Sequence, residues 1–281
     1  MVSRKMRLHF TLGPVQGFVS QARRTRDLWA GSYLLSYLSG KAMIAIGGEI
    51  IFPAVDADPL MQALRGIRPS MSDIAAQVGS LPNRFVAKTT DEKAGANAVG
   101  EIKRVWEEEI AETVWKRYIA RTCPSPATKE IWDRQIQNTW NCAWVIGDND
   151  TLLDRRKNLR TWFVPDEQGE KCTVCGERQE ISGKGLGSAA SRKAMSNWWM
   201  EFRQDDTISK LDLRDNERLC AVCIVKRLFP NVAETAIGRK VPTGFPSVSY
   251  MAAVEWIEKV MECGSKHEID TAVKGFVRQW K

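Results

Sequence analysis

Histidine is nearly absent from this sequence, which contains only His9 and His267. Histidine is the side chain that most often serves as a general base, a proton shuttle or a nitrogen ligand for metals. Catalysis that depends on it, including a nuclease site built on a histidine–aspartate pair, is therefore not expected. His9 falls in an alternating strand pattern, which favours a core or edge position with its hydrogen bonds satisfied.

Long apolar segments are also missing. No uncharged apolar run approaches the roughly 20 residues that a membrane helix needs. The first residues, Met1–Lys5, lack the apolar stretch of a secretory signal. The seven cysteines are odd in number, with four in two close pairs and three scattered at Cys123, Cys142 and Cys263. This is not a secreted disulfide framework, so we expect a reducing, cytoplasmic environment.

The charge balance is mildly basic, with 41 lysines and arginines against 34 acidic residues. Such an excess fits either an ordinary basic protein or one with a phosphate-rich partner. A cluster of arginines lies at Ala22–Asp27 (A-R-R-T-R-D). Arg23 and Asp27 are spaced to pair on a solvated helix face, and contact with RNA or a protein partner is the alternative interpretation.

Hydrophobic periodicity predicts an ordered series of strands and helices over residues 1–150. Met6–Leu12 alternates apolar and polar residues, as a strand does. The further elements expected are a helix at Pro14–Ile46, strands at Glu49–Ala54 and Asn83–Lys88, a helix at Asp91–Ala120, a helix at Thr128–Trp140 and a strand at Asn141–Gly147. This order is the ferredoxin-like βαββαβ pattern with one extra helix before the last strand. We therefore predict an α+β fold that begins with a ferredoxin-like domain.

The two paired cysteine motifs predict a metal centre in the second half. Cys172-Thr-Val-Cys175 and Cys220-Ala-Val-Cys223 are both C-x2-C, and four thiolates can close a tetrahedron around Zn²⁺. Gly176 suits the turn of such a knuckle. A closed site of four cysteines leaves no position for water, so the role is structural. Unmetallated thiols and a redox or iron–sulfur site are the alternatives.

The remaining sequence around this centre is mainly helical. We place the zinc-binding segment at 151–240, with a helix that carries the second cysteine pair and ends at Pro230. A further helical segment occupies 241–281, with a helix at Tyr250–Cys263.

Two other motifs carry weaker signals. Gly147-Asp148-Asn149-Asp150 gathers carboxylates after a strand and could bind Mg²⁺, but a polar turn that caps the following helix is the favoured interpretation. If Asp148 and Asp150 did hold Mg²⁺ near a triphosphate, the chain could be an independent nucleotidyltransferase. Gly13-Pro14-Val15-Gln16-Gly17 connects a strand to a helix start, where main-chain donors favour an anion.

Several strings together resemble a known family. They are G-P-V-Q-G-F at 13–18, A-R-R-T-R-D-L-W-A-G-S-Y-L-L-S at 22–36, L-P-N-R-F-V at 81–86, the two C-x2-C pairs, and G-F-P-S-V-S at 244–249. This combination resembles the large subunit of type III CRISPR effector complexes, Cmr type, over essentially the whole chain. The portion resembled is N-terminal and lacks the nuclease domain that begins the family's large subunits.

The resemblance implies a domain plan and a function. Residues 1–150 would be the first, degenerate palm, 151–240 the zinc-binding segment, and 241–281 the start of a thumb-like helical segment. In the family a second palm carries a Gly-Gly-Asp-Asp motif and cyclises ATP into oligoadenylates. This sequence has no such motif, so we expect a non-catalytic fragment or half of a split subunit. It would dock neighbouring subunits and contribute one side of an ATP pocket.

The resemblance also suggests residues for that pocket. The candidates for nucleotide or partner contact are Gln16, Gly17 and Ser32 on the first helix and Asn83 and Arg84 on a strand. ATP and Mg²⁺ are expected only together with a second palm. Ser32 has a simpler interpretation, as a small residue that permits close packing. The implied partners are the other subunits of the complex with its guide RNA and target RNA. The alternative is a free-standing zinc-ribbon protein that binds nucleic acid directly.

Overall fold

The computed structural model describes residues 5–67, 74–159, 163, 165–184, 187–210, 212–263, 271 and 274–275. His267 lies outside these residues. The chain divides into two units, Met1–Thr243 and Gly244–Lys281. Within the described residues, no helix is both long enough and apolar enough to cross a membrane.

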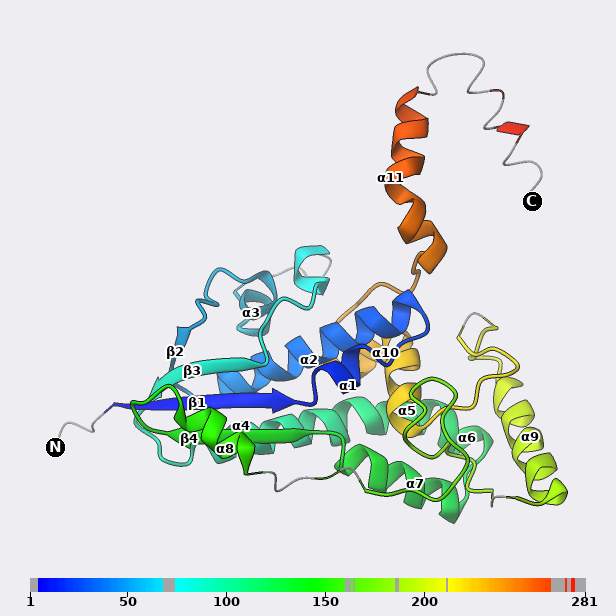
Figure 1. Cartoon of the computed structure of the whole chain (residues 1–281), viewed down its shortest axis with the longest axis horizontal. Coiled ribbons are helices and arrows are strands. Elements are labelled where there is room, and N and C mark those ends of the chain that lie inside the picture. Colours follow the sequence, from blue (N-terminus) through cyan, green and yellow to red (C-terminus); the bar gives the residue numbers. More distant parts are fainter. Residues whose placement is uncertain are drawn as a thin grey trace. The chain divides into compact units, whose positions relative to one another are not determined.

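The first unit is built on one antiparallel sheet (Figure 1). Its strands are β1 (Met6–Gly13), β2 (Glu49–Phe52), β3 (Arg84–Thr89) and β4 (Asn141–Ile146). The strand order is β2-β3-β1-β4, and every neighbouring pair is antiparallel. All four predicted strands are therefore present in a mixed α+β fold.

The central strand explains the alternating sequence pattern. Leu8, Phe10 and Leu12 are fully buried on one face of β1, and Phe10 stacks on its cross-strand partner Phe85 with ring centroids 5.1 Å apart. The other face is also covered at its centre. His9 is buried there and shares a 2.9 Å hydrogen bond through Nε2 with the carbonyl of Gly147. This confirms the prediction of a core histidine with a satisfied hydrogen bond.

Helices cover both faces of the sheet. In Figure 1, α2 (Thr25–Ala45) and α4 (Ala94–Lys103) lie behind it, and α8 (Leu152–Asn158) lies in front of β1 and β4. The shorter elements beside them are α1 (Gln16–Val19), α3 (Pro59–Leu64), η1 (Ile74–Gln77) and α7 (Pro126–Gln137).

The single long helix predicted for Pro14–Ile46 is wrong, because the chain breaks between α1 and α2. A residue distant in sequence binds the carbonyls at the break. The Nζ of Lys226 donates to the carbonyls of Phe18 at 2.7 Å and Gln21 at 2.5 Å. These carbonyls would otherwise accept hydrogen bonds from amides one turn later in a continuous helix.

The helix predicted for Asp91–Ala120 is present, but it is not purely α-helical. It runs from α4 through the π-helical stretches η2 (Arg104–Ala111) and η3 (Trp115–Ile119), separated by α5 (Glu112–Val114) and followed by α6 (Ala120–Thr122). Its buried residues Trp106, Ile110, Val114 and Tyr118 recur every fourth position. That spacing drifts around an α-helix of 3.6 residues per turn, and wider π turns compensate for the drift.

The second half adds α9 (Ala189–Arg203) and α10 (Ala221–Ile237) to the first unit. The predicted stop at Pro230 is wrong, because α10 continues to a left-handed cap at Gly238. Proline within a helix costs roughly 3 kcal/mol, and burial of Phe229, Val232 and Ala233 around it offsets this loss. The second unit contains α11 (Val248–Cys263).

Candidate metal centre and adjoining pocket

The first cysteine pair lies in a small hairpin. A bridge between Lys171 and Gln179 closes it, and the amide of Cys172 donates to the carbonyl of Arg178 at 2.8 Å. Gly176 has a φ of +69°, and its amide donates to the carbonyl of Cys172 at 2.9 Å. Glycine adopts this left-handed conformation without strain, so the chain can reverse directly after the second thiol.

The second pair begins α10. Cys220 is the N-cap residue, and its Sγ accepts a hydrogen bond from the amide of Cys223 at 3.4 Å. In the first pair, Cys172 Sγ likewise accepts from the amide of Val174 at 3.4 Å. Each C-x2-C turn therefore directs a main-chain donor at a sulfur atom, and hydrogen bonds to the charged form favour a thiolate.

Two sets of contacts bring the pairs together. The amide of Thr173 donates to the carbonyl of Arg218 at 2.8 Å, and the Arg218 amide donates to Thr173 Oγ1 at 3.0 Å. The buried side chain of Gln135 on α7 holds both pairs. Its Oε1 accepts from the amide of Ala221 at 2.7 Å, and its Nε2 donates to the carbonyl of Gln179 at 2.8 Å. Sequence reasoning missed Gln135, because a single polar residue on a helix carries no recognisable signal.

The resulting sulfur geometry fits a tetrahedral metal ion. The four Sγ atoms of Cys172, Cys175, Cys220 and Cys223 lie within 4.8 Å of one another. The Sγ atoms of Cys175 and Cys220 are 3.8 Å apart, whereas a disulfide requires about 2.05 Å. Zn–S bonds of about 2.3 Å place tetrahedral sulfurs about 3.8 Å apart. The cluster is compatible with a structural zinc site.

The pKa values of two of these thiols are shifted in opposite directions. Burial raises the pKa of the Cys220 thiol well above its ordinary value. Hydrogen bonding from Cys172, with further contributions from Cys220 and Cys223, lowers the pKa of Cys175. A divalent cation bound by the four sulfur atoms would favour the thiolate form of each.

This is the only cluster of three or more potential metal ligands within the part of the chain that the structure describes. Asp150 of the acidic turn pairs instead with Arg7 at 2.8 Å, and Arg7 Nη1 donates to the main-chain carbonyl of Asp148 at 3.3 Å. The turn therefore has a structural explanation, as a cap on the edge of the sheet.

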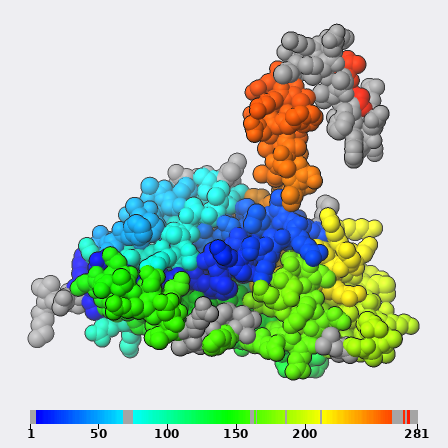
Figure 2. Space-filling model, viewed as in Figure 1, coloured from blue at the N-terminus to red at the C-terminus, as the bar shows by residue number. Residues whose placement is uncertain are grey.

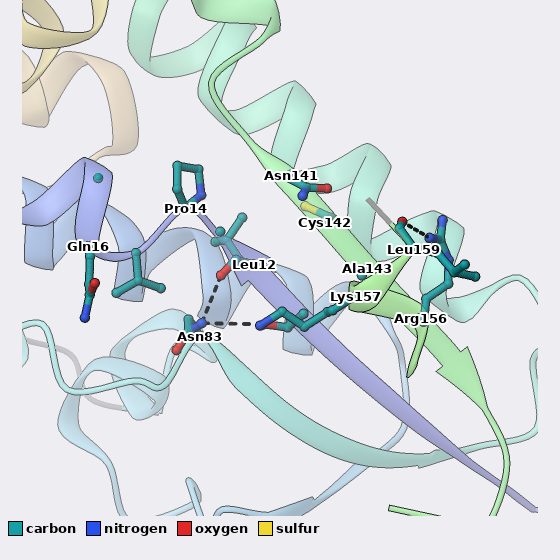
Figure 3. Close-up of a pocket in the computed structure, with 14 residues that line it drawn as sticks. Leu12, Pro14, Gln16, Asn83, Asn141, Cys142, Ala143, Arg156, Lys157 and Leu159 are labelled. Atoms are coloured by element: carbon teal, nitrogen blue, oxygen red, sulfur yellow. Dashed lines mark hydrogen bonds between the residues drawn. The ribbon is translucent and has the colours of Figure 1, made fainter. Parts of the chain in front are cut away.

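A pocket of about 690 Å³ lies where β1 passes into α1. Figure 3 shows Gln16, Asn83, Arg156 and Lys157 around it. Asn83 also fixes the end of β1, because its Nδ2 donates to the carbonyl of Leu12 at 2.9 Å. The charged residues that line the pocket are both basic, so it favours an anionic ligand. Arg156 and Lys157 belong to a basic run, R-R-K at 155–157, that the sequence interpretation passed over.

The structure brings three of the five nominated pocket residues together. Gln16, Gly17 and Asn83 line the pocket, whereas Ser32 and Arg84 are not among its lining residues. Arg84 makes a bidentate ion pair with Asp154 on α8, at 2.8 and 3.2 Å.

Ser32 lies instead at a packing contact. A Cβ on Gly79 would come within 2.6 Å of the Ser32 carbonyl oxygen, so the 79–80 segment approaches α2 closely at this point. This geometry agrees with the simpler interpretation of Ser32 as a small residue that permits close packing.

Two arginines of the cluster, Arg24 and Arg26, are largely buried within the first unit, whereas Arg23 is exposed. Asp27 pairs with the fully buried Arg227 of α10 rather than with the Arg23 side chain. Arg24 pairs with Glu217 at 2.7 Å, and Arg26 pairs with Asp212. In Figure 2 the blue N-terminal helices lie against the yellow segment near residue 210. These ion pairs therefore join the start of α2 to the segment between the two cysteine pairs.

Taken together, the antiparallel sheet, the four-cysteine cluster and the pocket lined by two basic residues define an α+β protein with a candidate metal centre. Comparison with known proteins shows what the chain is similar to. Residues 7–118 match the family model "CRISPR-associated protein Cmr2, N-terminal". A curated relative, the CRISPR system Cmr subunit Cmr2 of Pyrococcus furiosus, is 23% identical over 83% of this chain and 32% of its own length.

Solved structures show the same fold. The chain superposes on the type III-B Cmr-beta apo structure with a TM-score of 0.57 at 14% identity, covering 94% of this chain and 38% of the other. For Cmr-beta bound to cognate target RNA, the TM-score is 0.54 at 16% identity, and the match covers 93% of this chain and 37% of the other. The chain thus spans about a third of the length of these relatives. The predicted resemblance to the N-terminal region of the Cmr-type large subunit is confirmed.

Proposed function

We propose that this chain acts as the N-terminal, non-catalytic part of the large subunit of a type III-B CRISPR effector complex. The family match and the structural likeness to subunits of Cmr-beta support this role. One of those relatives is bound to target RNA. The partners would be neighbouring subunits of the same assembly, with guide RNA and target RNA held by the whole complex.

The sheet would be a ferredoxin-like palm that supplies one side of an ATP pocket. Antiparallel strands in the order β2-β3-β1-β4, with helices after β1 and β3, support this topology. The observation that carries the proposal is the pocket at the end of β1, where Gln16, Gly17 and Asn83 meet Arg156 and Lys157. Amide and cationic donors suit a triphosphate. Mg²⁺ and the catalytic carboxylates would come with a second palm.

The four cysteines would hold one structural Zn²⁺ that fastens the segment after the palm. The close spacing of their sulfur atoms and the burial of Cys172, Cys220 and Cys223 support a closed site. Zinc would supply folding free energy there and take no part in chemistry.

Direct nucleic-acid binding by a free-standing zinc ribbon is less favoured. Arg24 and Arg26 belong to the basic cluster for which RNA contact was an alternative interpretation, and they form ion pairs with Glu217 and Asp212 inside the first unit. That alternative predicts RNA binding by the isolated chain that weakens steeply with salt. The proposed role predicts RNA contact in the assembled complex instead.

The decisive experiment measures ATP binding by this chain mixed with a polypeptide that carries the second palm. Arg156→Ala combined with Lys157→Ala should weaken binding of radiolabelled ATP about tenfold or more, because two charge-assisted contacts are lost. Arg155→Ala is the matched control, since Arg155 precedes Arg156 in the same basic run but does not line the pocket. Unchanged ATP affinity in the double variant would contradict the pocket assignment. Failure of the two polypeptides to associate on size exclusion would contradict the proposed docking.

A further inference from the structure

Lys226 of α10 is an unusual buried lysine. Its side chain is 1% exposed, and its Nζ donates to the main-chain carbonyls of Phe18 at 2.7 Å and Gln21 at 2.5 Å. The same ammonium lies 5.1 Å from the centroid of the Phe18 ring. Both acceptors belong to the backbone, so Lys226 fixes the path of the chain between α1 and α2.

The position of Lys226 links that path to the cysteine centre. It lies one turn after Cys223 on α10. The next residue, Arg227, holds Asp27 in the first turn of α2 through a bidentate pair of 2.5 and 2.8 Å. Two successive residues of α10 thus hold the connection between α1 and α2. Lys226 binds its beginning at Phe18, and Arg227 binds its end at Asp27.

The connection is packed closely where Lys226 meets it. A Cβ on Gly31 of α2 would lie 3.3 Å from the Cα of Val19 and 3.6 Å from the Cδ of Lys226. The four-residue helix α1, which contains the pocket residues Gln16 and Gly17, directly precedes this contact. So short a helix is not stable by itself, and its geometry depends on tertiary anchors.

We propose that Lys226 is a positioning residue that couples metal occupancy of the four-cysteine centre to the pocket wall formed by Gln16 and Gly17. The inference rests on the proposed zinc site and is independent of the ligand that the pocket takes. Metal would fix Cys220 and Cys223 in the first turn of α10. That turn sets the position of Lys226, and Lys226 then holds the carbonyls that follow the pocket wall. Loss of metal or of the ammonium should loosen the same few residues.

Hydrogen exchange followed by mass spectrometry tests this coupling on the full chain. The amides of Phe18, Val19 and Ser20 are suitable reporters, because they donate to Val15 and Gln16 carbonyls within α1. Zinc content is measured first. Removal of zinc by a chelator should then speed exchange of these amides about tenfold or more, while the amides of β1 and β3 keep their protection.

Variants separate coupling from general loosening. Lys226→Met in the zinc-loaded protein should speed the reporters by a similar factor, and chelation should add little further change, because the link is already broken. Lys240→Met is the matched control, since Lys240 is exposed and lies in the segment after α10; it should leave the reporters unchanged. If Lys226→Met fails to fold, Lys226→Gln, which keeps a donor, should give a smaller increase with reduced sensitivity to chelation.

Two results would overturn the proposal. Unchanged reporters after chelation of the wild-type protein would show that the centre and the pocket wall are independent. Full additivity of chelation and the Lys226 substitution would show that the lysine does not transmit the effect. A purified chain without metal would instead refute the zinc site itself, and the coupling with it.

Discussion

The buried arginine Arg227 should be among the most sensitive positions in the protein. It is fully buried between two carboxylates, Asp27 and Glu217, which are 2% and 4% exposed. Its Nη1 also donates to the carbonyl of Asp212 at 2.8 Å. Arg227→Met keeps a similar volume but leaves Asp27 buried without its guanidinium partner. Breaking a buried pair in this way costs about 3–5 kcal/mol of the free energy of unfolding.

A double-mutant cycle separates the lost pair from the orphaned charge. Asp27→Asn in the Arg227→Met background removes the uncompensated carboxylate. Glu217 keeps its ion pair with Arg24, in which Nη2 and Oε2 are 2.7 Å apart. The double variant should therefore recover about 1–3 kcal/mol relative to Arg227→Met alone. The assay is urea unfolding with zinc in the buffer, with the slope against urea checked for constancy between variants.

The control is an exposed pair on the same unit. Lys116 and Glu112 lie 3.2 Å apart with side chains 72% and 35% exposed, so Lys116→Met should change the unfolding free energy by about 0.5 kcal/mol or less. If Arg227→Met stays within about 1 kcal/mol of the wild type, or if the cycle is additive, the burial argument is wrong.

Three further predictions concern the metal, acid and helix packing. Cys220→Ser should abolish stoichiometric zinc, measured by elemental analysis, and should loosen α10 and the cysteine hairpin, seen as faster hydrogen exchange of their amides. Burial opposes ionisation of Glu217, but hydrogen bonds from Arg227 hold its pKa below the ordinary value. The ionised Glu217 therefore stabilises the folded state above the pKa of about 4.3 that it has in the unfolded chain, and this stabilisation is lost as the pH falls through its lower pKa in the folded state. In Arg227→Met, the free energy of unfolding measured with urea should fall less steeply with acid. Gly95→Ala would place a Cβ within 2.2 Å of Trp144, so it should lower the free energy of unfolding in urea by about 1–3 kcal/mol. Gly100→Ala on the same helix is the control. Its Cβ would meet no atom within 4 Å, and the variant should be neutral or stabilising by up to about 1 kcal/mol.

The sequence by itself determined the four strands and the cysteines that come together. Alternation in Met6–Leu12 predicted β1, because a strand exposes alternate residues to one core. The two C-x2-C motifs predicted the sulfur cluster, because that spacing already brings each pair of thiols close enough to share one ion. The family resemblance, and not a local pattern, suggested Gln16, Gly17 and Asn83, which line the pocket together. The domain boundaries at residues 150 and 240 stay predictions.

Only the tertiary structure decided where helices break and which charges pair. Periodicity gave one helix over Pro14–Ile46, but Lys226 takes the carbonyls that would have continued it. Arg23 and Asp27 have the spacing of a local pair, yet Asp27 lies against Arg227. A buried carboxylate is stabilised most by the partner that is buried with it, and residues so far apart in sequence become neighbours only when α10 packs against α2. No local pattern contains that information.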